Sequence, residues 1–251
     1  MNSWPSQRMR TIEAEDYEAL SRRAADIIVA ELKRKPDLLL CASAGSTPTG
    51  AYNRLAARHA RQPGLFQRLR VLQIDEWGGL ERGNPACCEM DLERKLLRPL
   101  RIGPNRHVGF VTDAADPEHE CARIARWLEA NGPIDLCILG LGTNGHVAMI
   151  EPAQTITPRS HVAKLAKSSL KHPLLIDMKP KPRYGLTLGL GDILRSRRII
   201  LLVNGAHKRA SLARLLQPRI TTRFPASFLW LHPAVTVLYD RDAAGSLPAP
   251  S

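Results

Sequence analysis

The sequence predicts a single α/β domain, built on a mostly parallel open sheet with helices on both faces. Short apolar segments alternate along the 251 residues with segments of helical periodicity, which is typical of a parallel sheet covered by helices. A hydrophobic fraction of 44% is enough to form a full core. Because no internal repeat interrupts this pattern, we expect one domain over residues 1–251, with flexible ends at about 1–10 and 245–251.

The first predicted helix covers residues 11–34, where apolar side chains recur along one helix face. The other predicted helices begin near Pro48 and cover residues 88–100, 118–130 and 206–216. Apolar runs of strand length predict strands at residues 37–42, 69–74, 135–139, 198–203 and 234–239. Prolines in residues 170–183 break regular structure, so we expect a mobile loop there.

The formal charge of +12 suggests nucleic-acid binding, but the sequence pattern argues against it. The arginines are scattered over what we expect to be solvated helix faces, and only 5% of residues are aromatic. A general arginine bias and attraction of anionic substrates explain the charge more simply. We therefore expect no nucleic-acid partner.

The sequence also argues against a membrane protein and against a disulfide-bonded secreted protein. No apolar run approaches the roughly 20 residues that span a bilayer, and the N-terminal residues lack the apolar region of a signal peptide. We therefore expect a cytoplasmic protein with no membrane partner. The cysteines are odd in number and have no C-x-x-C spacing, which favours buried thiols over disulfides or metal ligands. They are Cys41, Cys87, Cys88, Cys121 and Cys137.

Residues 135–152 are the most informative stretch of the chain. An apolar strand leads into a glycine-rich turn that carries Asn144, His146 and Glu151. Ligands of open parallel sheets bind where strands end in their loops. An imidazole and a carboxylate close together at such a point indicate an acid and base pair that acts on a small molecule.

Three further strand ends carry candidate site residues. Gly45, Ser46 and Thr47 lie before a predicted helix, where free backbone amides would suit a phosphate, although a simple capped turn fits as well. Asp75 is a candidate base, with an N-cap or an ion-paired acid as the alternative. Lys208 falls in the first turn of a predicted helix, where a cation either reaches solvent or binds an anion. Their common place at strand carboxyl ends favours the functional interpretation of each.

Five segments together resemble the glucosamine-6-phosphate deaminase and 6-phosphogluconolactonase superfamily over residues 13–242. The chain looks most similar to the amino-sugar phosphate branch, in particular to galactosamine-6-phosphate deaminase/isomerases. The segments that carry the resemblance are GSTP at 45–48, DEW at 75–77, GLGTNGH at 140–146 with EP at 151–152, YGLTLG at 184–189 and PASFLWLHP at 225–233.

The resemblance implies a Rossmann-like sheet and a reaction without cofactor or metal, in which a hexosamine 6-phosphate becomes a ketohexose 6-phosphate and ammonia. By position, Asp75 would move a proton between C2 and C1. His146 would assist ring opening, and Glu151 would hold and tune His146. Lys208 and the loop at 45–47 would bind the phosphate. The partner would be a small sugar phosphate, and a homo-oligomer remains open.

One departure from the family pattern concerns Asn144, since hexosamine deaminases and lactonases carry aspartate there. The amide cannot take up a proton, although its carbonyl can still orient an imidazole. The galactosamine-type branch resembles this chain at that position, which favours a galactosamine-like substrate over loss of activity. A second phosphate-binding cation is left open among four candidates, which are Lys164, Lys167, Lys171 and Arg183.

Two alternatives remain. A 6-phosphogluconolactonase would use the same scaffold, but Glu151, Trp77 and residues 228–233 depart from the lactonase pattern. A sugar-phosphate sensor would carry an N-terminal DNA-binding segment, whereas only about 12 residues precede the first predicted helix. We expect His207 and His232 to be structural rather than catalytic.

Overall fold

The central sheet has seven strands in the order β1-β10-β9-β6-β2-β3-β5, and every neighbouring pair is parallel. This arrangement comes from a computed structural model that describes residues 9–166, 169–171, 173–176, 178–179 and 181–245. The strands are β1 (Arg10–Ala14), β2 (Leu39–Ala42), β3 (Arg70–Gln73), β5 (His107–Val108), β6 (Leu136–Gly140), β9 (Arg198–Val203) and β10 (Val235–Asp240).

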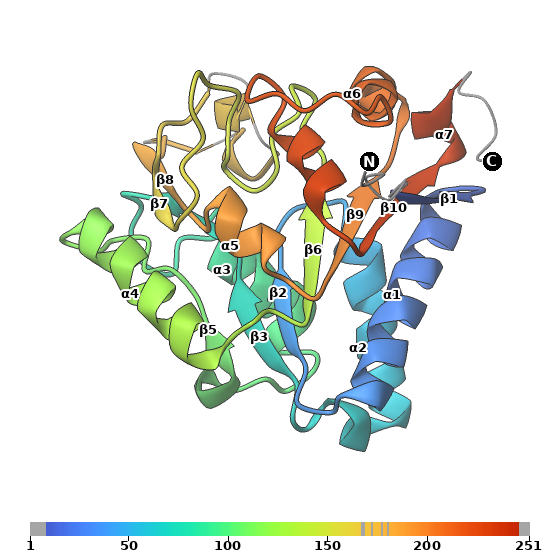
Figure 1. Cartoon of the computed structure of the whole chain (residues 1–251). Helices are drawn as coiled ribbons and strands as arrows, with labels where there is room; N and C mark the ends of the chain where they lie inside the picture. Colours follow the sequence, from blue (N-terminus) through green and yellow to red (C-terminus); the bar gives the residue numbers. More distant parts are fainter. Residues whose placement is uncertain (1–8, 167–168, 172, 177, 180, 246–251) are drawn as a thin grey trace, which may run out of the picture.

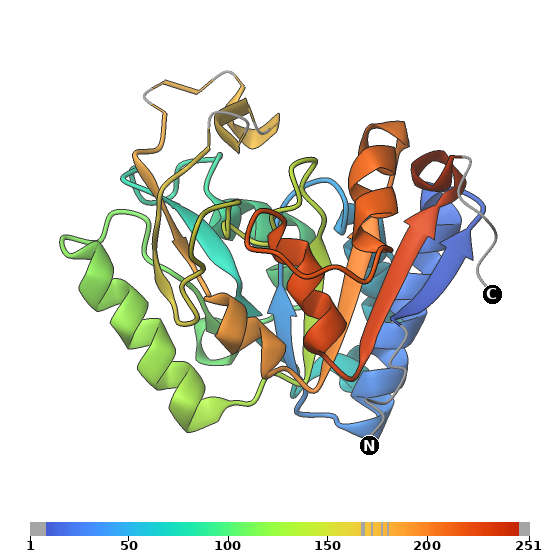
Figure 2. The same cartoon turned by 45° about the horizontal axis from the view of Figure 1, so that its top comes forward.

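Helices cover both faces of this sheet, as Figures 1 and 2 show. They are α1 (Tyr17–Arg34), α2 (Thr49–Arg61), α3 (Cys88–Leu92), α4 (Pro117–Asn131), α5 (Leu190–Leu194), α6 (Arg209–Leu215) and α7 (Arg241–Ala244). Successive side chains of β2 enter two different cores, because neighbours on a strand point to opposite faces. Leu40 belongs to the core that includes α1 and α2, whereas Leu39 belongs to the core that includes α4, α5 and α6. The predicted fold class is confirmed.

A smaller antiparallel sheet was not predicted. It has the order β4-β8-β7, with strands β4 (Asp75–Gly78), β8 (Tyr184–Thr187) and β7 (His161–Ala163). Only Ile74 separates β3 from β4, so the chain passes from one sheet directly into the other. Strands this short, with polar residues among them, give no periodic signal in the sequence.

Several predicted boundaries were wrong. The first part of the predicted helix 11–34 is β1, an edge strand paired with β10, and Asp16 then caps α1 by accepting the Ala19 amide at 2.7 Å. The predicted helix 88–100 is α3 followed by a π-helical turn at Glu93–Leu97. The predicted helix 206–216 begins as a 3-10 turn, Ala206–Lys208, before α6.

The ends predicted to be flexible lie largely outside the described residues, as does part of the loop 170–183. The described part of that loop includes the short 3-10 turn Pro173–Leu175. All five cysteines are buried and free. Within the described residues, no helix is both long and apolar enough to cross a bilayer.

Candidate active site

A pocket of about 430 Å³ opens at the carboxyl ends of β2, β6 and β9. The order of the central sheet reverses between β2 and β6, and ligands of open α/β sheets bind at such a switch point. All the predicted site residues line the pocket except Asn144, which contacts His146. The lining members are Gly45, Ser46, Thr47, Asp75, His146, Glu151 and Lys208.

The loop at residues 43–48 is held by side chains of the surrounding helices. Gly45 has a φ of 101°, a backbone conformation that favours glycine. The Tyr17 hydroxyl donates to the Ser46 carbonyl and accepts the Gly50 amide, both at 2.8 Å. The expectation of a free amide at Gly45 was wrong, because that amide donates to Asp91 at 2.9 Å. The Gly45 amide is therefore already bonded to a buried carboxylate and is not free to bind a ligand.

Asp75 begins β4 and is buried in the pocket wall. Burial raises its pKa to about 7, and the neighbouring carboxylate of Glu76 adds to that rise. A carboxyl group with this pKa exchanges protons readily at neutral pH, as a general base must. Asp75 forms no ion pair among the described residues, which argues against the alternative that it is an ion-paired acid.

Asn144 connects His146 to Glu151. Its amide nitrogen donates to Oε2 of Glu151 at 2.8 Å, and its carbonyl oxygen lies 2.8 Å from Nδ1 of His146. The direct distance from that Nδ1 to Oε2 of Glu151 is longer, at 3.6 Å. Burial lowers the pKa of His146, Glu151 opposes that change, and Lys208 adds to it. The lowered pKa favours the neutral ring, which can accept a proton.

Lys208 ends the 3-10 turn Ala206–Lys208 and precedes α6. Burial lowers its pKa from the ordinary lysine value. A half-buried cation in a pocket is more stable with an anion bound beside it. Lys208 thus places a cation at this end of the pocket, where an anionic group of a ligand would meet it.

Sequence reasoning missed part of the pocket. His207 lines it beside Lys208, although we expected only a structural role for this residue. Ser169 also lines the pocket, and its hydroxyl donates to Glu151. No periodicity or motif marks Ser169, since it lies in the short 3-10 turn Ser169–Lys171. His232 is structural as predicted, with Nε2 buried 2.7 Å from the Ser196 carbonyl.

The second phosphate-binding cation is not found among the candidates that can be placed. Lys164 and Arg183 are exposed and do not line the pocket. Lys167 and the side chain of Lys171 lie outside the described part of the chain.

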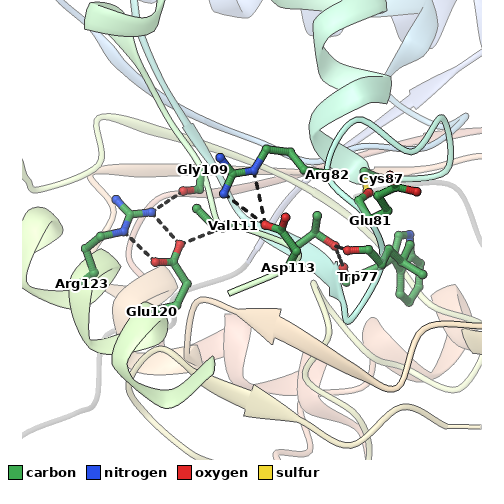
Figure 3. Close-up of polar contacts among 11 residues, drawn as sticks. Trp77, Glu81, Arg82, Cys87, Gly109, Val111, Asp113, Glu120 and Arg123 are labelled. Atoms are coloured by element: carbon green, nitrogen blue, oxygen red, sulfur yellow. Dashed lines mark hydrogen bonds and ion pairs between the residues drawn. The ribbon is translucent and has the colours of Figure 1, made fainter. Parts of the chain in front are cut away.

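Trp77 forms another wall of the pocket, and a polar network behind it holds its main chain (Figure 3). The Thr112 hydroxyl donates to the Trp77 carbonyl. The preceding amide, that of Val111, donates to Glu120 at 2.7 Å, and Arg123 pairs with Glu120 at 2.6 Å. Side chains of α4 therefore help to fix the segment that holds the Trp77 main chain.

The family model for glucosamine-6-phosphate isomerases and 6-phosphogluconolactonase matches residues 13–238. The chain belongs to this family. Among curated relatives, a glucosamine-6-phosphate deaminase of Geobacillus sp. (strain WCH70) is 36% identical over 246 residues, covering 96% of both chains. The resemblance inferred from the five segments is confirmed.

Solved structures of the family agree with the fold. A monomeric glucosamine-6-phosphate deaminase superposes with a TM-score of 0.89 at 34% identity, covering 94% of this chain and 99% of its own. A 6-phosphogluconolactonase from Trypanosoma brucei reaches 0.80 at 21% identity, covering 97% and 100%. This second likeness concerns the fold only.

Proposed function

We propose that the protein is a hexosamine-6-phosphate deaminase, which converts its substrate and water to a ketohexose 6-phosphate and ammonia. The observation that carries the proposal is the place of Asp75. It is a buried carboxyl group with a pKa near 7, in one pocket with a loop at a helix N-terminus and with Lys208. Relatives named as glucosamine-6-phosphate deaminases at 34–36% identity support the same conclusion.

The sugar phosphate would bind with its phosphate between Lys208 and the amides that follow Gly45. Helix N-termini favour anions because their amides lack partners within the helix. A lysine adds a charge-assisted contact of the kind that holds phosphates in many sites. This placement leaves the sugar carbons to the part of the pocket where Asp75 and His146 lie.

Asp75 would act on the open-chain form of the sugar. Its carboxylate accepts the C2 proton, and the electron pair of that bond forms a C1–C2 double bond while the C1 oxygen gains a proton. Asp75 returns its proton to C1, and the C2 amino group loses one proton, which balances the proton gained by the C1 oxygen. The resulting imine at C2 is hydrolysed by water to the ketose and ammonia. A positioned base of this kind typically contributes about 100- to 10,000-fold in rate.

His146 would open the sugar ring before this step. With Nδ1 bonded to Asn144, Nε2 is the nitrogen available to move a proton between the anomeric hydroxyl and the ring oxygen. Glu151 supports this geometry through Asn144. The balanced reaction needs only water, so we propose no cofactor or metal.

The substrate we favour is galactosamine 6-phosphate, with glucosamine 6-phosphate as the other candidate. This preference rests on Asn144, which resembles the galactosamine-type branch. Lactone hydrolysis is the alternative activity, and Glu151 and Trp77 in the pocket argue against it.

The test is ammonia release by the purified protein from galactosamine 6-phosphate and glucosamine 6-phosphate, with hydrolysis of 6-phosphogluconolactone as the control. We expect ammonia from at least one hexosamine, and the ratio of kcat/KM values identifies the preferred sugar. Lactone hydrolysis without ammonia would establish the lactonase instead. Inactivity on all three would favour the sensor.

A further inference from the structure

The short helix α3 lies between the strand that carries Asp75 and the loop at residues 43–48. The fully buried carboxylate of Glu76, next to Asp75 on β4, accepts the first two amides of α3. These are the amides of Cys88 at 2.7 Å and Glu89 at 2.8 Å. Glu76 therefore fixes the N-terminus of α3 to the strand of the proposed base.

The other end of α3 contacts the loop through Asp91. This side chain is 1% exposed, and its Oδ2 accepts the Gly45 amide at 2.9 Å and Nζ of Lys95 at 2.8 Å. Lys95 also donates to the Gly45 carbonyl at 3.1 Å. The Thr49 hydroxyl donates to the same carbonyl at 2.8 Å. The peptide groups on both sides of Gly45 are thus held by Asp91, Lys95 and Thr49, and none of these three side chains lines the pocket.

We propose that Asp91, together with Lys95, is a positioning residue that sets the conformation of the phosphate-binding loop. Gly45 has a positive φ, and its amide is turned toward Asp91 rather than toward the pocket. With that amide fixed, the amides of Ser46 and Thr47 are held in one orientation before any phosphate arrives. Donors that need no reordering bind an anion more tightly, since less conformational entropy is lost on binding.

A chemically matched aspartate lies at the opposite end of the sheet. Oδ2 of Asp135 accepts the Leu39 amide at 2.9 Å and Nζ of Lys35 at 2.6 Å, and Arg197 pairs with its Oδ1 at 3.2 Å. Asp91 has the corresponding arginine, Arg94, at 3.0 Å. Replacing either aspartate by asparagine removes an ion pair between a buried carboxylate and more exposed basic side chains, but only Asp91 contacts the loop.

This inference rests on the proposed function for its kinetic readout. The experiment compares wild type, Asp91→Asn, Lys95→Met and the control Asp135→Asn in ammonia release from a hexosamine 6-phosphate. Thermal unfolding is recorded for each variant. Binding of inorganic phosphate is measured by calorimetric titration, which does not depend on turnover.

For Asp91→Asn we expect KM and the Kd of inorganic phosphate to rise about tenfold, with kcat within about twofold, because a neutral amide replaces the carboxylate that accepts the Gly45 amide and the ion pair with Lys95 is lost. Lys95→Met should change the same two constants in the same direction. Asp135→Asn should lower the unfolding temperature while both constants stay at the wild-type values.

Wild-type KM and phosphate Kd in both Asp91→Asn and Lys95→Met would overturn the inference. If Asp91→Asn does not fold, Lys95→Met decides alone. An equal rise in both constants for Asp135→Asn would also overturn it, because the effect would then be one of general destabilisation. If wild type releases no ammonia, the proposed function fails, and the phosphate titration still tests the role of Asp91.

Discussion

The carbonyl oxygen of Asn144 lies 2.8 Å from Nδ1 of His146, and this contact determines which ring nitrogen carries the proton. The Asn144 amide nitrogen donates to Glu151, so the oxygen faces His146 as an acceptor. Nδ1 must then be the protonated nitrogen, which leaves Nε2 free for proton transfer. Glu151 thus influences the imidazole mainly through the amide between them.

Removing this amide should slow ring opening. We expect Asn144→Ala to lower kcat about 10- to 100-fold, because the histidine loses the group that fixes its tautomer. Asn131→Ala, which breaks one hydrogen bond from an asparagine to the Trp127 carbonyl in α4, is the matched control and should keep wild-type kcat. Steady-state ammonia release measures both variants, and an unchanged kcat for Asn144→Ala would contradict the role of the amide.

Asn144→Asp should have a different effect. A carboxylate at this position would lie beside both Glu151 and His146, and its negative charge would raise the pKa of the imidazole. The pKa of His146 is lowered by burial and lies below that of Asp75, so we expect a second, lower inflection of the acidic limb, that of His146, to move to higher pH. A profile identical to that of wild type would show that His146 does not titrate in the reaction.

The pH dependence of kcat should report Asp75. The carboxyl group accepts a proton only when ionised, and its pKa is raised to about 7 by burial and by Glu76. The rate should therefore increase as pH rises through about 7. Asp75→Asn should lose turnover while still binding inorganic phosphate. Near-wild-type activity of this variant would show that another group is the base.

The same carboxyl group should destabilise the protein at alkaline pH. Its pKa rises from 3.8 to about 7 on folding, so its contribution to stability is present below pH 3.8 and is lost as pH rises through 7. At pH 8 the free energy of unfolding of Asp75→Asn should exceed that of wild type by up to about 4 kcal/mol. At pH 4 the two proteins should be about equally stable. Urea unfolding at both pH values tests this difference. Equal stability of the two proteins at pH 8 would contradict the raised pKa.

Lys208→Met should weaken phosphate binding more than it changes chemistry. The lysine is half-buried in the pocket, where its charge is poorly screened, so we expect KM to rise about tenfold or more. The Ki of inorganic phosphate as a competitive inhibitor should rise by the same factor. Lys33→Met, on the exposed face of α1, is the control. A lower kcat with unchanged KM and unchanged Ki would place Lys208 in the chemical step instead.

The central sheet and most of the pocket could be predicted because they rest on strong local signals. Buried strands such as β6 read as continuous apolar runs, and the loops that follow them carry the polar residues of the site. The short antiparallel strands β4 and β8 could not be predicted, since they form only through pairing distant in sequence.

The contacts around the site residues were equally hidden. The sequence places Asn144 near His146, but it does not show that the Asn144 side chain lies between His146 and Glu151. That position depends on the folded conformation of the turn. Asp91 gave no signal, because its partner Gly45 lies far away along the chain. Such positioning contacts depend on tertiary structure rather than on a motif.

The most direct test of the account is the product balance of wild type and Asp75→Asn incubated with galactosamine 6-phosphate and with glucosamine 6-phosphate. We expect wild type to release one ammonia for each ketohexose 6-phosphate formed from at least one of the two sugars, and Asp75→Asn to release none. Absence of ammonia from both sugars with folded wild-type protein would contradict the proposed deaminase.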